Sequence, residues 1–263
     1  MVYDFHNDAE RYFNLQYIHS KEYIVPIAKN FLDFNTTLRI LEIGSAEAGV
    51  LKAFTELNHD CVGVEISESR VNLAKKFMKK EMDEGLISFF DSDIFKVNVE
   101  DLGGKFDLII LKDVIEHIHG REKLYDKFKE FLKPNGLVFI AMPPWCMPFG
   151  GHQQMLHNKI YSRLPYFHLL PMWFTKLLLK WDKYPYIDAW EDIKATRISI
   201  NGFKREIKRN GFIIKKEIYY LINPNYKFKF NLNPKEQFGI ITAIPYLRDF
   251  LTTTVYYLIE SEK

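Results

Sequence analysis

Apolar positions near the start of the chain recur at the spacing of an α-helix. Over residues 4–32 they include Tyr12, Phe13 and Ile24. Side chains three and four positions apart share one side of a helix, so this pattern predicts helix throughout the segment. Pro26 divides the prediction into two helices, because proline has no N–H group to donate within a helix.

Short apolar runs then alternate with segments of helical period. Five of the runs have the length of buried strands: LRILEIGS, CVGVEIS, LISFFDSD, KFDLIILKD and LVFIAMPP. Helical patterns lie between them at residues 47–57, 67–85 and 121–136. This alternation predicts an α/β fold with a doubly wound, mostly parallel sheet and helices on both faces.

Helix-ending signals and one interruption divide the chain further. Ser67 is expected to cap the 67–85 helix, which Gly85 closes, and Pro134 is expected to stop the 121–136 helix. After Pro143-Pro144 the alternation gives way to an aromatic-rich segment. A helix (SINGFKREIKRNGF), a strand (FIIKKEIYYL), a loop or hairpin and a last strand (TTTVYYLIES) follow. We therefore expect an N-terminal helical flap (1–34), a catalytic domain (35–144 and 196–263) and an inserted cap (145–195).

Composition narrows the kinds of partner. The net charge of +2 is too small to indicate nucleic acid, and 47% hydrophobic residues are typical of a globular chain. The two cysteines lack metal-type spacing, and the N-terminus lacks a signal-peptide pattern, so we expect a cytoplasmic protein. Residues 164–181 are apolar, but their two prolines and two lysines argue against a membrane-spanning helix. A membrane-surface or dimer contact through residues 145–190 stays open.

The first predicted strand ends in a glycine turn that runs from Glu42 to Gly49 and reads EIGSAEAG. Ligands of open α/β sheets bind at the carboxyl ends of strands, where a glycine turn lets the backbone approach them closely. A P-loop needs Lys and then Ser or Thr after its second glycine, which Val50-Leu51 do not supply. The dinucleotide fingerprint G-x-G-x-x-G fails at Ala46. The turn therefore favours S-adenosylmethionine (SAM), which carries no phosphate.

Acidic residues stand at the ends of the next two strands. Glu65 follows Glu42 by 23 positions, which matches the acid that binds ribose hydroxyls in nucleotide folds. Asp93 follows the third strand, where it would meet the adenine amino group. Any one of these acids is equally well explained as a helix cap. Three in order, each at the carboxyl end of a strand, favour a nucleoside ligand.

These segments resemble the successive motifs of class I SAM-dependent methyltransferases. LEIGSAEAG, VGVEIS, DSDIF, FDLIILKDVIEHI and LKPNGLVFIAMPP carry the resemblance over about residues 38–144. It implies a seven-stranded sheet whose last strand, VYYLIES, is antiparallel. The resemblance also implies the residues around the cofactor: Glu42, Gly44, Ser45, Ala46, Gly49 and Lys112 at the methionine part, Glu65 at the ribose, and Ile66, Asp93 and Ile94 at the adenine. Ala46 and Ala48 depart from the usual G-x-G-x-G of the family.

A second cluster, Asp113-Val114-Ile115-Glu116-His117, follows the fourth strand. On a helix, Asp113 would lie on the same face as Glu116 and His117. The simplest interpretation is that these residues cap the helix or meet the cofactor, with no metal bound. With a later histidine, His152 or His157, the pattern also resembles metal-assisted O-methyltransferases, including ubiquinone-pathway enzymes and small-RNA 2′-O-methyltransferases. Asp113, Glu116, His117 and His152 are then candidate ligands of a divalent metal, and His117 or His152 can alternatively act as a general base.

The inserted cap follows the fifth strand and so lies on the acceptor side of the site. Pro143, Pro144, Trp145 and His152 stand where family members carry acceptor-binding residues. From the N-terminal helix, Tyr12, Gln16 and Tyr17 are expected to close over the cofactor. A cap with its own small core and an apolar acceptor pocket are both consistent with the composition of the insertion.

These observations predict methyl transfer from SAM to a small-molecule or lipid-like acceptor, preferably at oxygen. The sulfonium already activates the methyl group, so the protein has to align the acceptor and, for a hydroxyl, remove its proton. Asp113, His117 and His152 are the candidates for that step. The alternatives are an RNA or protein methyltransferase, a nicotinamide-dependent oxidoreductase, which Ala46 opposes, and an inactive interaction protein of the same fold.

Overall fold

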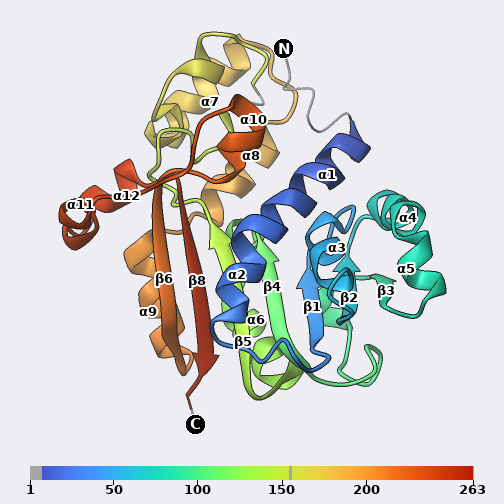
Figure 1. Cartoon of the computed structure of the whole chain (residues 1–263). Coiled ribbons are helices and arrows are strands. Elements are labelled where there is room, and N and C mark those ends of the chain that lie inside the picture. The colour runs from blue at the N-terminus through green and yellow to red at the C-terminus, as the bar shows by residue number, and fades with distance from the viewer. Residues whose placement is uncertain (1–7, 154–155, 263) are drawn as a thin grey trace.

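A computed structural model describes residues 8–153 and 156–262, so residues 4–7 of the expected first helix lie outside the described residues. Its centre is an eight-stranded sheet in the order β3-β2-β1-β4-β5-β8-β6-β7 (Figure 1). The strands are β1 (Arg39–Ile43), β2 (Asp60–Glu65), β3 (Ile87–Asp91), β4 (Phe106–Lys112), β5 (Leu132–Met142), β6 (Phe212–Ile222), β7 (Lys235–Glu236) and β8 (Thr254–Ser261).

The directions of the strands confirm the expected fold class. β1 to β5 pair in parallel, and β8 inserts antiparallel between β5 and β6. The segment VYYLIES therefore occupies the predicted antiparallel place. The expected count of seven strands was one short, because the two-residue strand β7 adds to the edge beside β6. So short a strand carries no recognisable alternation in the sequence.

Helices cover both faces of the sheet (Figure 1). Ile40 and Leu108 point to the face covered by α1, α2 and α3, whereas Leu41 and Ile109 point to the face covered by α6 and α9. Successive residues of a strand point to opposite faces, so these apolar runs fill two cores. The helices are α1 (Ala9–His19), α2 (Val25–Lys29), α3 (Gly49–Thr55), α4 (Glu68–Phe77), α5 (Lys79–Asp83), α6 (Arg121–Phe131), α7 (Met172–Trp181), α8 (Ile187–Ala195), α9 (Ile200–Arg209), α10 (Asn225–Phe230), α11 (Gly239–Ala243) and α12 (Leu247–Leu251).

Several expected helices differ at their ends. The predicted division of the N-terminal helix is confirmed. The dividing element is a π-helical turn at Ser20–Ile24, in which the N–H of Val25 donates to the carbonyl of Ser20. Pro26 cannot donate to the preceding turn, which accounts for the shift in the hydrogen-bond ladder. The 67–85 helix is broken at Met78. The 121–136 helix ends at Phe131, before Pro134, because Leu132 already pairs with Phe106 in the sheet.

The insertion after β5 folds over the carboxyl ends of the parallel strands (Figure 1). It contains α7 and α8 and has a small core of its own, formed by Leu156, Phe167, Leu179, Tyr184 and Trp190. This arrangement matches a cap that builds its own core. Within the described residues, we found no helix with the length and apolar character needed to cross a membrane.

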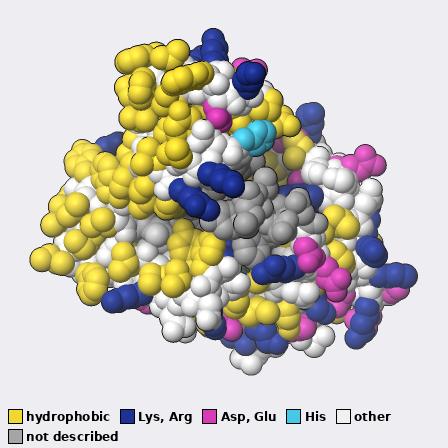
Figure 2. Space-filling model, turned by 90° about the horizontal axis from the view of Figure 1, so that it is seen from above, with side chains coloured by type: hydrophobic (Ala, Val, Ile, Leu, Met, Phe, Trp, Pro, Cys, Tyr) yellow, Lys and Arg dark blue, Asp and Glu magenta, His cyan; other side chains and the backbone are white. Residues whose placement is uncertain are grey.

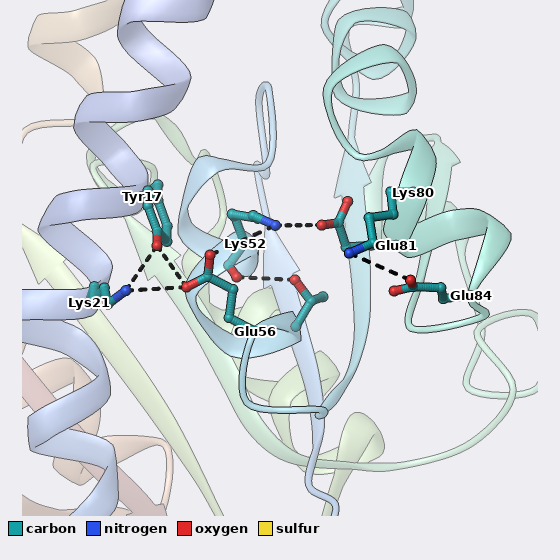
Figure 3. Close-up of polar contacts among 8 residues, drawn as sticks. Tyr17, Lys21, Lys52, Glu56, Lys80, Glu81 and Glu84 are labelled. Carbon is teal, nitrogen blue, oxygen red and sulfur yellow. Dashed lines mark hydrogen bonds and ion pairs between the residues drawn. The ribbon is translucent and has the colours of Figure 1, made fainter.

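Helix α1 packs closely against the start of α3 because Gly49, the first residue of α3, has no side chain. A Cβ atom on Gly49 would lie 2.3 Å from the carbonyl oxygen of Phe13 and 2.8 Å from Cβ of Gln16. Polar contacts hold the other end of this packing (Figure 3): the hydroxyl of Tyr17 donates to Glu56 at 2.6 Å, and Lys21 pairs with the same carboxylate at 3.3 Å. The position of α1 above the glycine turn therefore depends on Gly49.

We expect Gly49→Ala to lower the free energy of unfolding by about 2 kcal/mol, because the added methyl group forces α1 away from α3. Gly239→Ala is the matched control, since nothing lies within 4 Å of its added Cβ atom, and its effect should stay within about 0.5 kcal/mol. Urea unfolding followed by circular dichroism measures both. Equal stabilities of the two variants would contradict the packing argument.

Candidate active site

The glycine turn and helix α1 enclose a pocket at the carboxyl end of β1. Its empty space is about 280 Å³, and it is lined by Tyr12, Phe13, Gln16, Glu42, Gly44, Ser45, Ala46, Glu47, Gly49, Val50 and Lys112. The predicted cofactor residues of the glycine turn therefore lie together with Lys112 in this pocket. The α1 residues Tyr12 and Gln16 close the pocket, as the sequence predicted.

Polar atoms that can accept hydrogen bonds are concentrated in this pocket. Among the described residues, four of its buried oxygens have no hydrogen-bond partner: Gln16 Oε1, Glu42 Oε2, Ser45 Oγ and Glu47 Oε2. Burial raises the pKa of Glu42 well above its usual range, although the charge of Lys112 opposes this. Unpartnered buried acceptors are costly in a folded protein. They fit a ligand that brings hydroxyl and ammonium donors, as SAM does.

Two alanines of the turn have left-handed backbone conformations. The φ angles of Ala46 and Ala48 are 48° and 68°, in the region where a Cβ atom costs roughly 1–2 kcal/mol. Gly44 also has a positive φ, and a Cβ atom there would lie 2.6 Å from Val114. The two alanines that depart from G-x-G-x-G therefore hold backbone conformations that favour glycine, and the turn is strained there.

Glu65 links the turn to the end of β2. One of its carboxylate oxygens accepts the N–H of Ala46 and the other accepts the N–H of Ser67, both at 2.9 Å. Each carboxylate oxygen can accept a further hydrogen bond, so ribose hydroxyls can still be bound here. The neighbouring Ile66 is 73% exposed, as a residue that packs on a bound adenine ring would be.

Asp93 and Ile94, which follow the third strand, have different roles. Asp93 accepts the N–H of Phe95 at 3.0 Å and so caps the short 3₁₀ helix Ile94–Lys96. Its other oxygen stays available to an adenine amino group. The side chain of Ile94 is buried in the sheet core. The 3₁₀ helix turns this side chain inward, so a contact of Ile94 with adenine would be made by its backbone.

Lys112 and Asp113 form an ion pair at the end of β4, with Nζ and Oδ2 2.7 Å apart. Although burial opposes it, the ammonium of Lys112 lowers the pKa of Asp113. Asp113 has a left-handed φ of 56° and precedes a 3₁₀ turn at Ile115–His117 instead of the expected α-helix. The pair therefore separates Asp113 from the residues with which it was predicted to bind metal.

Helix α10 contributes residues that the sequence did not indicate. Asn225 donates to Asp113 at 3.4 Å, and Tyr226 is close enough for the charge of Asp113 to help burial raise its pKa. Burial lowers the pKa of Lys229, and the nearby charge of Lys112 adds to this effect. The segment was expected to be a loop or hairpin. Its alternating lysines and aromatics gave no sign of a helix next to the site.

Tyr17 lies elsewhere than predicted. Its hydroxyl donates to Glu56 and accepts from Lys21, on the side of α1 that faces the end of α3 (Figure 3). Tyr12, five positions earlier in the chain, lines the pocket instead. Tyr17, predicted both to close over the cofactor and to contact the substrate, therefore does not line this pocket and attaches α1 to the end of α3.

Glu116, His117 and His152 come together on the cap side of β4. One ligand atom from each lies within 4.8 Å of the other two, and the imidazole rings are 5.1 Å apart between centroids. Burial, reinforced by Asp113, raises the pKa of Glu116 to about 8, and burial lowers the pKa of His117. Asp113 does not belong to this group. His157, the other predicted later histidine, is exposed and packs against Tyr184.

A second pocket lies next to this cluster. It encloses about 250 Å³ and is lined by Glu116, Pro143, Trp145, Gly150, His152, Ile193, Arg197 and Ile198. Val114, two residues before Glu116 in the chain, packs against Gly44 of the glycine turn. Of the residues predicted to bind the acceptor, Pro143, Trp145 and His152 line this pocket. Pro144 is buried and does not line the pocket, because its carbonyl accepts the N–H of Met147 in a turn.

Comparison with known proteins agrees with this geometry. The model of a methyltransferase domain family matches residues 15–188. A ubiquinone biosynthesis O-methyltransferase from Chelativorans sp. is 29% identical over 104 residues, which are 40% of this chain and 40% of that protein. Phosphoethanolamine N-methyltransferase 2 from Caenorhabditis elegans is 29% identical over 117 residues, 44% of this chain and 26% of that protein. The chain thus aligns with less than half of the length of these relatives.

The fold extends the likeness over nearly the whole chain. The crystal structure of an S-adenosylmethionine-dependent methyltransferase from Clostridium acetobutylicum superposes with a TM-score of 0.56, at 11% sequence identity, over 94% of this chain and 92% of that one. The chain therefore belongs to the methyltransferase domain family and carries a class I SAM-dependent methyltransferase domain.

We expect Ala46→Gly to raise the free energy of unfolding by about 0.5–1 kcal/mol. Glycine removes the strain of the left-handed conformation, and its greater freedom in the unfolded chain offsets only part of that gain. Ala53→Gly, in the middle of α3, is the control and should lower stability by about 1 kcal/mol. Thermal unfolding of the two variants measures the difference. A loss of stability in both would show that Ala46 is not strained.

His168 ties the cap to the acceptor pocket, because its Nε2 donates to the carbonyl of Trp145 at 2.7 Å. Burial lowers its pKa from 6.5 to about 4. As the pH falls, the imidazole of the unfolded chain is therefore protonated before that of the folded chain. The folded state loses stability between pH 6.5 and 4, by at most about 1.4 kcal/mol per pH unit. His168→Gln keeps a donor but cannot be protonated. Its unfolding free energy, measured by urea titration, should depend less on pH in this range than that of the wild type.

Proposed function

We propose that this protein transfers the methyl group of SAM to an oxygen atom of a small-molecule or lipid-like acceptor. The observation that carries the proposal is the position of the Glu116–His117–His152 cluster. It contributes Glu116 and His152 to the lining of the second pocket, and Val114, two residues before Glu116, packs against Gly44 of the glycine turn. A hydroxyl bound in the second pocket would have a base in the wall of that pocket.

An oxygen acceptor suits the chemistry of the cluster. A hydroxyl must lose its proton as the methyl group arrives, and imidazole is the side chain best suited to accept it near neutral pH. The lowered pKa of His117 keeps its imidazole neutral and able to accept a proton. The O-methyltransferase relative supports this choice of atom, whereas the N-methyltransferase relative supports nitrogen.

A divalent metal is the second candidate for activating the hydroxyl. The mutual distances of up to 4.8 Å between the ligand atoms of Glu116, His117 and His152 suit one ion after small side-chain movements. The Oε2 atom of Glu116 is buried and has no hydrogen-bond partner among the described residues. These residues would hold Mg²⁺, Mn²⁺ or Zn²⁺. Such an ion would lower the pKa of a bound hydroxyl.

Transfer of a labelled methyl group tests the proposal. We expect the purified chain to methylate phenols with adjacent hydroxyl groups in preference to phosphoethanolamine. His152→Gln should lower kcat/KM about 100-fold or more, the usual loss for a group that transfers a proton. Calorimetric binding of SAM should be unchanged in this variant. Chelation followed by addition of each metal separates metal activation from a metal-free base.

His157→Gln is the matched control, because His157 is exposed and lies outside the cluster. It should retain wild-type activity. Efficient methylation of phosphoethanolamine by His152→Gln would overturn the choice of oxygen. If Glu65→Gln left the affinity for SAM unchanged, the assignment of the cofactor pocket would be wrong, whatever the acceptor.

A further inference from the structure

The face above the carboxyl ends of the strands carries large hydrophobic side chains in unusual number (Figure 2). Six that are more than half exposed are Trp173 (71%), Leu177 (57%), Trp181 (82%), Phe238 (53%), Ile240 (74%) and Tyr246 (71%). Isolated exposed hydrophobics are normal, but a contiguous group marks a surface that meets an apolar partner. We call these six residues and their neighbours the apolar face.

Helix α7 supplies half of the apolar face. Thr175 and Leu179 are fully buried against the cap. Trp173, Leu177 and Trp181 recur at every fourth position and so form a separate stripe on the solvent side. A surface helix usually exposes polar residues there. Helix α7 is therefore apolar on two sides, and burial in its own cap explains only one of them.

The segment around α11 and α12 supplies the other half. Phe238, Ile240 and Tyr246 project from the connection between β7 and β8, far from the cap in sequence. The two halves touch: the rings of Tyr166 and Phe250 lie 6.1 Å apart between centroids, and the hydroxyl of Tyr166 donates to the carbonyl of Phe250. They therefore form one surface, as Figure 2 shows in yellow.

The charges around the apolar face are mostly positive. Residues 156–186 and 237–251 together contain six basic and two acidic residues, although the whole chain has a net charge of only +2. Of the two acids only Asp182 reaches the surface, and one of the six bases, Lys176, is paired with Glu191 of α8. Asp249 is buried and accepts the N–H of Ile200, and Asp182 is bonded to Asn158. Lys180 and Lys183 are exposed beside Trp181.

We propose that the apolar face binds to the surface of a lipid bilayer with anionic headgroups. Tryptophan and tyrosine are the residues that prefer the boundary between water and lipid. Lysines at the edge of such a surface extend to the phosphates while their stems cover apolar area. The ten-residue helix α7 lies flat in this arrangement, with the Trp173–Leu177–Trp181 stripe in the lipid.

A second copy of the chain suits the face less well. A symmetric dimer places the same patch on both sides of the interface, so that the lysines of both copies would be gathered in one interface. Like charges brought together in an interface oppose association. The basic excess is instead complementary to phosphate groups, and the proposal does not depend on which acceptor is methylated.

Co-sedimentation with vesicles tests the proposal. The full chain should sediment with vesicles of equal parts phosphatidylcholine and phosphatidylglycerol, and less with pure phosphatidylcholine. The double variant Leu177→Glu, Tyr246→Glu should bind about tenfold or more weakly, because each half of the face loses a buried apolar side chain. Lys180→Gln with Lys183→Gln should reduce binding to the anionic vesicles only.

Leu57→Glu is the matched control, since Leu57 is similarly apolar and 38% exposed but precedes β2 at the opposite end of the sheet. It should bind vesicles like the wild type. Circular dichroism and SAM binding confirm that each variant is folded. Absence of vesicle binding by the wild type would overturn the proposal. So would a dimer, seen by light scattering, that Leu177→Glu dissociates and that does not bind vesicles.

Discussion

The hydrogen bond from the N–H of Ala46 to the carboxylate of Glu65 determines where the parts of this site lie. It joins the turn after β1 to the end of β2, so the turn cannot move without the sheet. The same turn places Gly49 at the start of α3. Because glycine has no side chain, α1 can contact the backbone of α3 there. Because carboxylate oxygens accept several hydrogen bonds, Glu65 can fix the protein and bind a ribose at the same time. One buried acid thus connects the fold to the cofactor.

The features that could be predicted from the sequence are those with a local cause. β1, β2 and β4 are mainly apolar because both of their faces are buried. The polar residues at their carboxyl ends lie at one edge because parallel strands end together. Helix α10 had no such signal. Its alternating lysines and aromatics resemble a strand, and only the pair Tyr226 and Phe230, four positions apart and in ring contact, indicates a helix. The contacts of α10 with Asp113 come from 112 positions away in the chain.

Asp113 shows why spacing alone could not define the second cluster. Its distance from Glu116 and His117 in sequence suggested a shared helical face, but the left-handed backbone at Asp113 ends β4 and directs its carboxylate to Lys112. A buried lysine without a partner would be costly, so the ion pair takes precedence over the helix. Glu116 and His117 are then joined by His152, whose own φ is also positive. The grouping depends on backbone conformations that residue types do not reveal.

The inserted cap connects the acceptor pocket to the apolar face. Ile193 of α8 lines the pocket, Trp181 of α7 is open to solvent, and the ion pair between Lys176 and Glu191 joins the two helices. The cap that supplies part of the pocket lining therefore also holds the outer stripe in place. A lipid-like acceptor, if that is the substrate, would then reach the pocket along the cap from a surface on which the protein already rests. Such an approach keeps the apolar part of the acceptor away from water. This route explains why both sides of α7 are apolar, which packing within the cap alone does not explain.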